Sequence, residues 1–302
     1  MKKLLISLLL GIVSLLSAYS RQQTQELPQW VISFVESSHS IMLFPLYVQS
    51  QISGRINPEG STIAQRIRTP KGYYRDSLPP DSFGYFLRHF PLEPHGTKVV
   101  YYNGQPKRNP VYVAVLKADV GTRDLQQCAD AVIRLRAEYL YACERYADIH
   151  FNFTNGFRAD YSKWAEGFRI RVNGNRTEWY KAAAPDSSYA NFRRYLNVVF
   201  AYAGTLSLSR ELATVPYTGL QPGDVFIQGG SPGHAVIVMD VAVNPQGHKL
   251  YLLAQSYMPA QSIHVLKNPN DPALSPWYSL SGTSLIHTPE WNFTSGNLKR
   301  FK

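Results

Sequence analysis

The feature that most constrains the fold of this chain is the segment 220–243, LQPGDVFIQGGSPGHAVIVMDVAV. Pro222 followed by Gly223 favours a type II turn, because proline presets φ and glycine accommodates a positive φ. A short strand is expected next, and a second turn then leads into His234 and an unbroken apolar run at 235–238. Because such a run is typical of a strand buried on both faces, we expect His234 at the end of a buried strand. A glycine-rich loop precedes it, and loops on a rigid scaffold often present reactive side chains.

This order of turn, strand, Gly-His and apolar strand resembles the second half of the papain-like cell-wall amidases and endopeptidases, the NlpC/P60 and CHAP domains. In those families, the histidine is the general base for a cysteine nucleophile. The resemblance implies an α+β fold in which an antiparallel sheet packs against helices. It places a papain-like portion at about residues 120–267 and leaves an N-terminal α/β extension before it.

The folded part of the chain is expected to form one α+β domain over residues 61–302. Apolar stripes at a spacing of about 3.6 residues predict its helices, and apolar runs between turn residues predict its strands. The central elements predicted in this way are helices at 122–145 and 188–203 and strands at 225–227, 235–243 and 249–254. The tail from Asn268 is rich in proline, tryptophan and tyrosine, and we expect it to cover the surface.

Two alignments to the papain-like families differ in where they place the nucleophile. In the first, the helix 188–203 is the nucleophile-bearing helix, because its apolar pattern and its distance to Gly223 fit. The nucleophile position then falls on Asn191 or Phe192, and neither side chain can attack a carbonyl. This alignment predicts a fold that has lost its chemistry, with Phe192 facing the sheet near His234.

In the second alignment, Gln127 and Cys128 match the Gln-Cys pair of CHAP domains. A helix N-terminus lowers the pKa of a thiol, which favours a cysteine nucleophile at Cys128. His234 is then the base, and Gln255 is the polar group that orients it, since an antiparallel neighbour returns the end of one strand to the start of the other. Against this, Cys128 falls in the second turn of the predicted helix and on its apolar stripe, which is typical of a buried core cysteine. Both alignments stay open.

Other side chains are candidates for binding rather than for chemistry. Ser256, Tyr257 and Gln261 follow a predicted buried strand and could form hydrogen bonds to a ligand at the mouth of a cleft, and Trp164 is one of several aromatic residues that could stack on a sugar. The histidines show no spacing typical of a metal site, so neither a metal nor a cofactor is predicted. Cys128 and Cys143 would lie about 22 Å apart on one helix at 1.5 Å per residue, too far for a disulfide.

The N-terminus has the features of a secretory signal peptide over residues 1–20, with basic residues, an apolar core and small residues before the expected cleavage point. A lipid anchor is not expected, because Tyr19 occupies the position where a lipoprotein signal needs cysteine. Residues 21–60 are expected to be poorly structured, and no transmembrane segment is expected in the mature chain. We therefore predict an exported protein of the periplasm or cell envelope.

The charge of the chain favours anionic partners. The formal net charge is +10, and removal of the signal peptide takes away Lys2 and Lys3 but no acid, which leaves +8. A surplus of this size attracts anionic polymers over long range, and for an exported bacterial protein we expect an envelope polymer such as peptidoglycan. Basic residues are scattered and form no nucleic-acid-binding motif, so a nucleic-acid partner is not expected.

Longer segments carry a second resemblance. The segments 124–139, 202–208, 229–235 and 254–261 are similar to a family of exported bacterial proteins, one of the numbered domains of unknown function. This resemblance implies export but no activity. The function predicted is therefore that of a cell-envelope protein whose papain-like cleft binds or acts on peptidoglycan or a muropeptide-like ligand, without catalysis. The alternative is an active cysteine amidase or peptidase that uses Cys128 and His234.

Overall fold

The computed structural model describes residues 54–279 and 285–302. The predicted signal peptide, Tyr19 and most of the segment 21–60 lie outside these described residues. Within them, no helix combines the length and the apolar character needed to cross a membrane.

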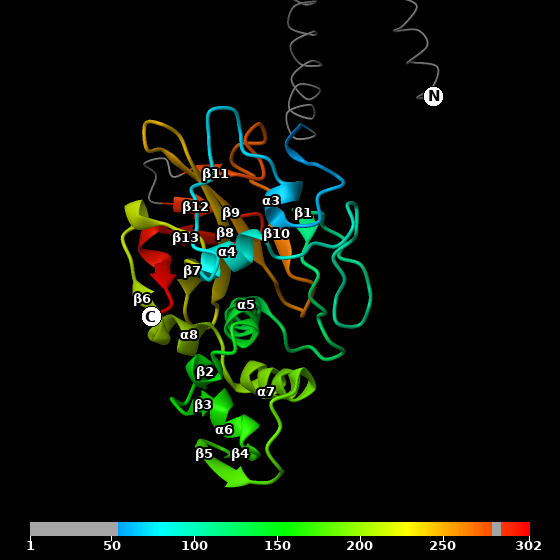
Figure 1. The fold of residues 1–302 in the computed structure, drawn as a ribbon, viewed down its shortest axis with the longest axis vertical. Coiled ribbons are helices and arrows are strands. Elements are labelled where there is room, and N and C mark those ends of the chain that lie inside the picture. The colour runs from blue at the N-terminus through cyan, green and yellow to red at the C-terminus, as the bar shows by residue number, and fades with distance from the viewer. Residues whose placement is uncertain (1–53, 280–284) are drawn as a thin grey trace, which may run out of the picture. The chain divides into compact units, whose positions relative to one another are not determined.

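The described chain is a mixed α+β structure built on an antiparallel sheet of eight strands (Figure 1). Its centre is β7–β8–β9, the three consecutive strands that the sequence predicts, and each pair of neighbours is antiparallel. In spatial order, the strands are β1 (Tyr112–Val115), β10 (His264–Leu266), β9 (Lys249–Gln255), β8 (His234–Val243), β7 (Val225–Gln228), β14 (Leu298–Arg300) and β6 (Ala213–Thr214), with β11 (Tyr278–Ser279) also paired to β9.

Strand β8 is buried on both faces, which explains its unbroken apolar run. Because side chains alternate along a strand, Ala235 and Ile237 belong to the core cluster that includes α5, whereas Val236 and Val238 belong to a second cluster on the other face. A bulge shifts the register with β9 between Val238 and Asp240. The strand therefore lies at the centre of a layered structure, and His234 is its first residue.

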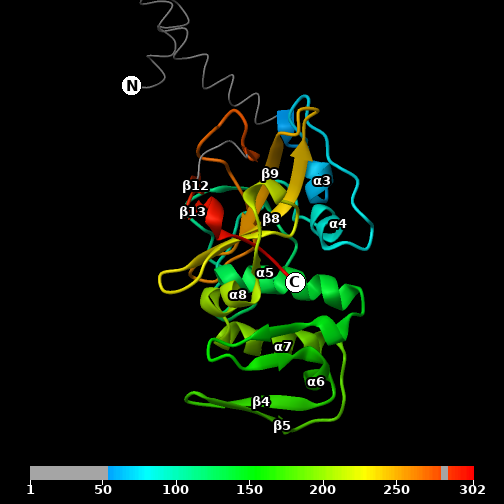
Figure 2. The ribbon, with the colours of Figure 1, turned by 90° about the vertical axis from the view of Figure 1, so that its left-hand side faces the viewer.

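Helices and small sheets surround this core. Helix α5 packs against β8 and β9, and α7 lies on the other side of α5 from the sheet, as both views show (Figures 1 and 2). The helices are α3 (Ile63–Arg66), α4 (Phe83–Arg88), α5 (Cys128–Ala142), α6 (Tyr161–Ala165), α7 (Tyr189–Tyr202) and α8 (Thr205–Glu211). The two-stranded sheets are β2 (His150–Asn152) with β3 (Arg158–Asp160), β4 (Phe168–Asn173) with β5 (Arg176–Lys181), and β12 (Leu285–His287) with β13 (Asn292–Thr294).

The start of α5 differs from the predicted helix 122–145. The helix begins at Cys128, because the Asp130 carboxylate accepts a hydrogen bond from the Gln127 N–H at 3.0 Å and so stabilises the first turn there. An apolar stripe does not reveal such a cap, since Leu125 continues the same spacing before the helix starts. The correction moves Cys128 from the second turn to the first residue of the helix.

The position of Phe192 contradicts the first alignment. Its ring stacks on Tyr141 of α5, with ring centroids 4.4 Å apart, and it also contacts Tyr161 and Tyr189. Because α5 lies between α7 and the sheet (Figure 2), Phe192 does not face the sheet near His234, and that prediction is wrong. The helix that packs on β8 is α5, and it carries Cys128 at its start.

The tail beyond Asn268 is part of the sheet rather than a surface covering. Its last strand, β14, pairs with both β7 and β6. Phe293 and Leu298 are buried in the core cluster opposite α5. The tail therefore completes the sheet and brings residues near 290 toward β8.

Candidate functional site

The site begins with His234 and Gln255, which lie at adjoining ends of β8 and β9. The His234 Nε2 atom is 2.8 Å from the Gln255 Oε1 atom, and both residues are buried. Their positions follow from the antiparallel register, which pairs Ile237 with Ala254 and so returns the end of β9 to the start of β8. The predicted pairing of these two side chains is present.

Cys128 reaches the same end of the sheet from α5. Its sulfur accepts a hydrogen bond from the backbone N–H of Ala235, the residue that follows His234, and also from the N–H of Ala129. Cys128 is 8% exposed and lines a cleft of about 420 Å³, whose other walls include the glycine loop 230–233, the segment 203–205 and Met258. Cys128 thus lies beside the residue that follows His234, although neither His234 nor Gln255 is among the residues that line this cleft. Among the described residues, no hydrogen bond joins the Cys128 sulfur to the imidazole.

The pKa of the thiol is higher than the position at a helix start predicts. Burial raises the pKa of Cys128 to about 11, and the charge of Asp130 adds to this rise. Backbone N–H groups lower it, but they do not compensate for the loss of water. The expected depression of this pKa is therefore wrong, and Cys128 is a thiol at neutral pH.

The imidazole of His234 is neutral as well. Burial lowers the pKa of His234 to about 4, and the positive charge of Lys107 lowers it further, while the hydrogen bond to Gln255 opposes the change. The ring is enclosed by Tyr257, Trp291 and Phe293, with ring centroids 4.9, 5.5 and 5.9 Å away. An apolar wall of this kind disfavours the charged form.

Two of the predicted binding residues hold the loops of the site together. The Ser256 hydroxyl lies 2.9 Å from the Gln126 carbonyl oxygen and 2.8 Å from that of Gln261, so it connects the end of β9 to the segment before α5. The Gln261 amide nitrogen donates to the Pro259 carbonyl. Both residues are buried, and their contacts keep Cys128 next to the start of β8.

Sequence reasoning missed two charged residues of the site. The Gln255 amide nitrogen donates to the Glu290 carboxylate at 2.6 Å, and Lys107 forms an ion pair with the same carboxylate, also at 2.6 Å. Glu290 lies in the turn between β12 and β13, which the Thr288 and Trp291 backbones close. No local pattern marks either residue, because both come to the site through the tertiary fold.

One family model matches the chain. It is described as "Domain of unknown function (4846)", and it covers residues 63–300. The chain belongs to this family. No curated protein matches the chain, and no solved structure does. The match covers most of the chain and names no activity.

Trp164 is not among the residues that line the Cys128 cleft. It is 4% exposed, its indole N–H donates to Asn191 at 3.0 Å, and the Arg169 guanidinium lies over its ring at 4.3 Å. These two neighbours belong to α7 and β4. The described residues contain no group of three or more His, Cys, Asp or Glu side chains arranged to hold a metal ion.

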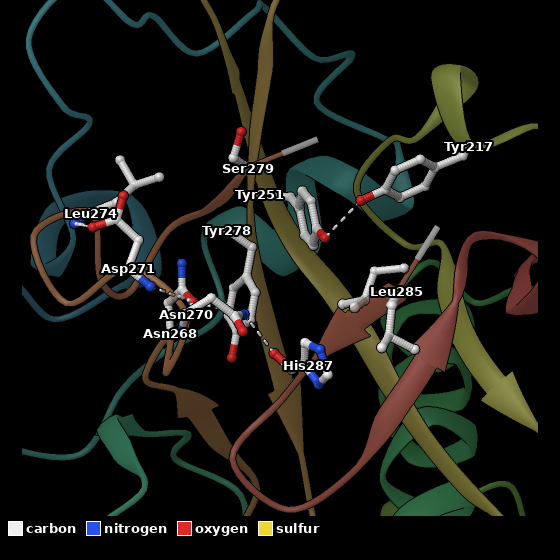
Figure 3. Close-up of a pocket in the computed structure, with 11 residues that line it drawn as sticks. Tyr217, Tyr251, Asn268, Asn270, Asp271, Leu274, Tyr278, Ser279, Leu285 and His287 are labelled. Atoms are coloured by element: carbon white, nitrogen blue, oxygen red, sulfur yellow. Dashed lines mark hydrogen bonds between the residues drawn. The ribbon is translucent and has the colours of Figure 1, made fainter. Parts of the chain in front are cut away.

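A second cavity, larger than the Cys128 cleft, lies on the face of the sheet opposite α5. Its volume is about 490 Å³, and Tyr251 and Tyr278 form one wall. Figure 3 shows the Tyr217 and Tyr251 hydroxyl groups facing each other, 3.0 Å apart, with Asn270 and His287 across the cavity. The Tyr278 hydroxyl donates to the Lys267 carbonyl and the Asn270 amide donates to the His287 carbonyl, and no cysteine lines the cavity.

Proposed function

We propose that the chain is a cysteine-dependent amide hydrolase with a papain-like arrangement of Cys128, His234 and Gln255. The observation that carries the proposal is the His234–Gln255 hydrogen bond directly beside a sulfur that the Ala235 N–H holds. A thiol at a helix start, an imidazole at a strand start and an amide at the end of the next strand supply a nucleophile, a base and an orienting group.

In the proposed reaction, the His234 Nδ1 atom takes the thiol proton as the Cys128 sulfur attacks the carbonyl carbon of an amide. The N–H groups of the first turn of a helix have no backbone partner within it, and those at the start of α5 can donate to the oxygen that becomes negative. The C–N bond then breaks, and the leaving amine takes the proton from the imidazolium. Water hydrolyses the thioester, with His234 again as the base, and the free thiol returns.

The proposed substrate is an amide of peptidoglycan or of a muropeptide in the cell envelope. The predicted signal peptide and the net charge of +8 support this location and this class of partner. No lysine or arginine is among the described residues that line the Cys128 cleft, whereas Asp124 and Asp130 are. Basic residues elsewhere on the chain would therefore attract the polymer, and the cleft would receive a neutral or amine-bearing part of it.

A second candidate is a non-catalytic binding protein that uses the same cleft. The burial of Cys128, the raised pKa of its thiol and the lack of a sulfur–imidazole hydrogen bond among the described residues favour it. In this case, the Gln255 cluster fixes the shape of the cleft and the substrate is held without reaction.

Purified peptidoglycan fragments distinguish the two candidates. The catalytic proposal predicts that the wild-type chain releases new amino groups and that Cys128→Ser still binds the fragments but releases none. Cys143→Ser is the matched control, because Cys143 is an exposed cysteine at the other end of α5. Binding by the wild type without any release would overturn the catalytic proposal in favour of the binding one.

A further inference from the structure

A chain of polar contacts runs from His234 into the tail of the protein. His234 contacts Gln255 at 2.8 Å, Gln255 contacts Glu290 at 2.6 Å, and Glu290 contacts Lys107 at 2.6 Å. The Lys107 side chain is 4% exposed and the Glu290 side chain is 15% exposed. These four residues come from four separate segments of the chain, so the contacts depend on the complete fold.

The Glu290 carboxylate determines which way the Gln255 amide points. An amide side chain offers an oxygen that accepts and a nitrogen that donates, and either end could face His234. An ionised carboxylate only accepts hydrogen bonds, so the Gln255 nitrogen must face Glu290 and the oxygen must face His234. Lys107 pairs with the other oxygen of the same carboxylate at 2.6 Å, which leaves one oxygen to accept from Gln255.

The orientation of the amide in turn fixes the proton on the imidazole. Since the Gln255 oxygen only accepts, the neutral His234 ring must carry its proton on Nε2 and leave the Nδ1 lone pair free. Nδ1 is the atom that the proposed reaction uses as its base. If the amide turned over, its nitrogen would face Nε2, and the proton would move to Nδ1, where it blocks that role.

We propose that Glu290, anchored by Lys107, is a positioning residue that sets the tautomer of His234 through Gln255. The proposal rests on the proposed function for its consequence in catalysis, but the tautomer itself is independent of turnover. The tail of the chain, which covers the site through the β12–β13 turn, is then part of the machinery that makes the imidazole a base.

The ¹⁵N chemical shifts of the His234 ring, recorded at neutral pH on the full chain, test this directly. The wild type is expected to show a protonated Nε2 and an unprotonated Nδ1. Glu290→Gln removes the acceptor-only group with almost no change in shape, so a substantial share of the Nδ1-protonated form is expected. Lys107→Met should produce a smaller share of the Nδ1-protonated form, because the Glu290 carboxylate remains and loses only its ion pair. His234→Asn identifies the signals.

The controls separate this role from general damage to the fold. Glu178→Gln removes a carboxylate that pairs with Arg171 and Arg176 on the exposed β4–β5 hairpin, and it should leave the His234 shifts unchanged. Glu290→Asp, which keeps an acceptor-only group, should restore most of the Nε2-protonated form. In assays of hydrolysis, Glu290→Gln should lower kcat on the order of 10–100-fold with little change in KM, which is typical of a residue that orients a reacting group through another.

Two results would overturn the inference. One is an imidazole protonated on Nδ1 in the wild type, and the other is an identical Nε2-protonated ring in the wild type and in Glu290→Gln. Neither depends on hydrolysis. A Cys128→Ser variant that still hydrolyses the substrate would instead end the proposed function and leave the tautomer result as it stands.

Discussion

The Cys128 cleft and the tyrosine cavity lie against opposite faces of the same sheet, and they differ in what their side chains can do. The tyrosine cavity is the larger, at about 490 Å³ against about 420 Å³. Its tyrosine hydroxyl and asparagine amide groups pair with one another or with backbone, as with Tyr217 and Tyr251. The Cys128 cleft instead holds a thiol beside the start of β8, the strand whose first residue is His234. Of these two regions, the smaller is therefore the one whose side chains can carry out the proposed chemistry.

The largest expected difference between the two regions is in hydrolysis. Cys128→Ser should lower kcat/KM at least about 10³-fold, since removal of a nucleophile leaves only the contribution of binding. Tyr251→Phe, which removes a hydroxyl from the other cavity, should leave kcat/KM within about twofold of the wild type under the same criterion. Initial rates of amine release on one muropeptide substrate measure both. Equal losses in the two variants would erase the distinction between the regions.

The second expected effect is a loss of folding stability in acid, which arises from two buried histidines. The pKa values of His234 and His264 are lowered by burial, to about 4 and about 3, from an ordinary value of 6.5. The unfolded chain therefore binds more protons below pH 6.5, so the stability is fully present above that pH and is lost as the pH falls towards 4. We expect a loss of about 3 kcal/mol or more over this window.

Urea unfolding at pH 7 and at pH 4 checks this acid sensitivity. His264→Phe is the matched variant, because His264 is buried beside Gln255 in the sheet but belongs to neither cavity. It should lose distinctly less stability between the two pH values than the wild type does. An equal pH dependence in wild type and variant would show that the acid effect arises elsewhere.

The same lowered pKa shapes the pH profile of hydrolysis. With a His234 pKa of about 4 and a Cys128 pKa of about 11, neither group changes its charge between pH 6 and 8. The value of kcat/KM should therefore vary less than about twofold across that range, because such profiles report the pKa values of the free enzyme. A fall below pH 7 with a midpoint near 6.5 would contradict the buried, neutral imidazole.

Gln255→Ala tests the polar cluster itself. The substitution leaves His234 and Glu290 without their partner in a buried place, so it should cost about 1–3 kcal/mol of unfolding free energy. Asn270→Ala, which removes a hydrogen bond to the His287 carbonyl in the tyrosine cavity, should cost about 1 kcal/mol or less. Thermal and urea unfolding give both values. A larger loss from Asn270→Ala would mean that the tyrosine cavity, rather than the cleft, holds the more demanding polar cluster.

The sequence predicts the parts of this site that depend on local chemistry. The turn at Pro222 and Gly223, the buried strand after His234 and the return of Gln255 all follow from apolar runs and turn residues. The start of α5 does not, because the hydrogen bond from the Gln127 N–H to the Asp130 carboxylate decides it, and apolar spacing carries no trace of that bond.

The contacts of Glu290 with Gln255 and Lys107 lie beyond any local pattern. They span 35 and 183 positions of the chain, and they form only when the tail inserts β14 beside β7. The difference between the predicted and the observed position of Phe192 has the same kind of cause. Two helices have similar apolar stripes, and only tertiary packing decides that α5, rather than α7, covers β8. The sequence therefore leaves two predicted helices, 122–145 and 188–203, as candidates for the helix that carries the nucleophile.

The most direct test of the central claim is the intact mass of the protein quenched with acid during turnover of a muropeptide amide. The proposed reaction predicts a transient gain equal to the acyl part of the substrate, located on Cys128 by peptide mapping, and absent from Cys128→Ser. Cys143, which is exposed, should carry none of it. Release of the amine without any acyl group on Cys128, or an acyl group on Cys143 alone, would contradict the account.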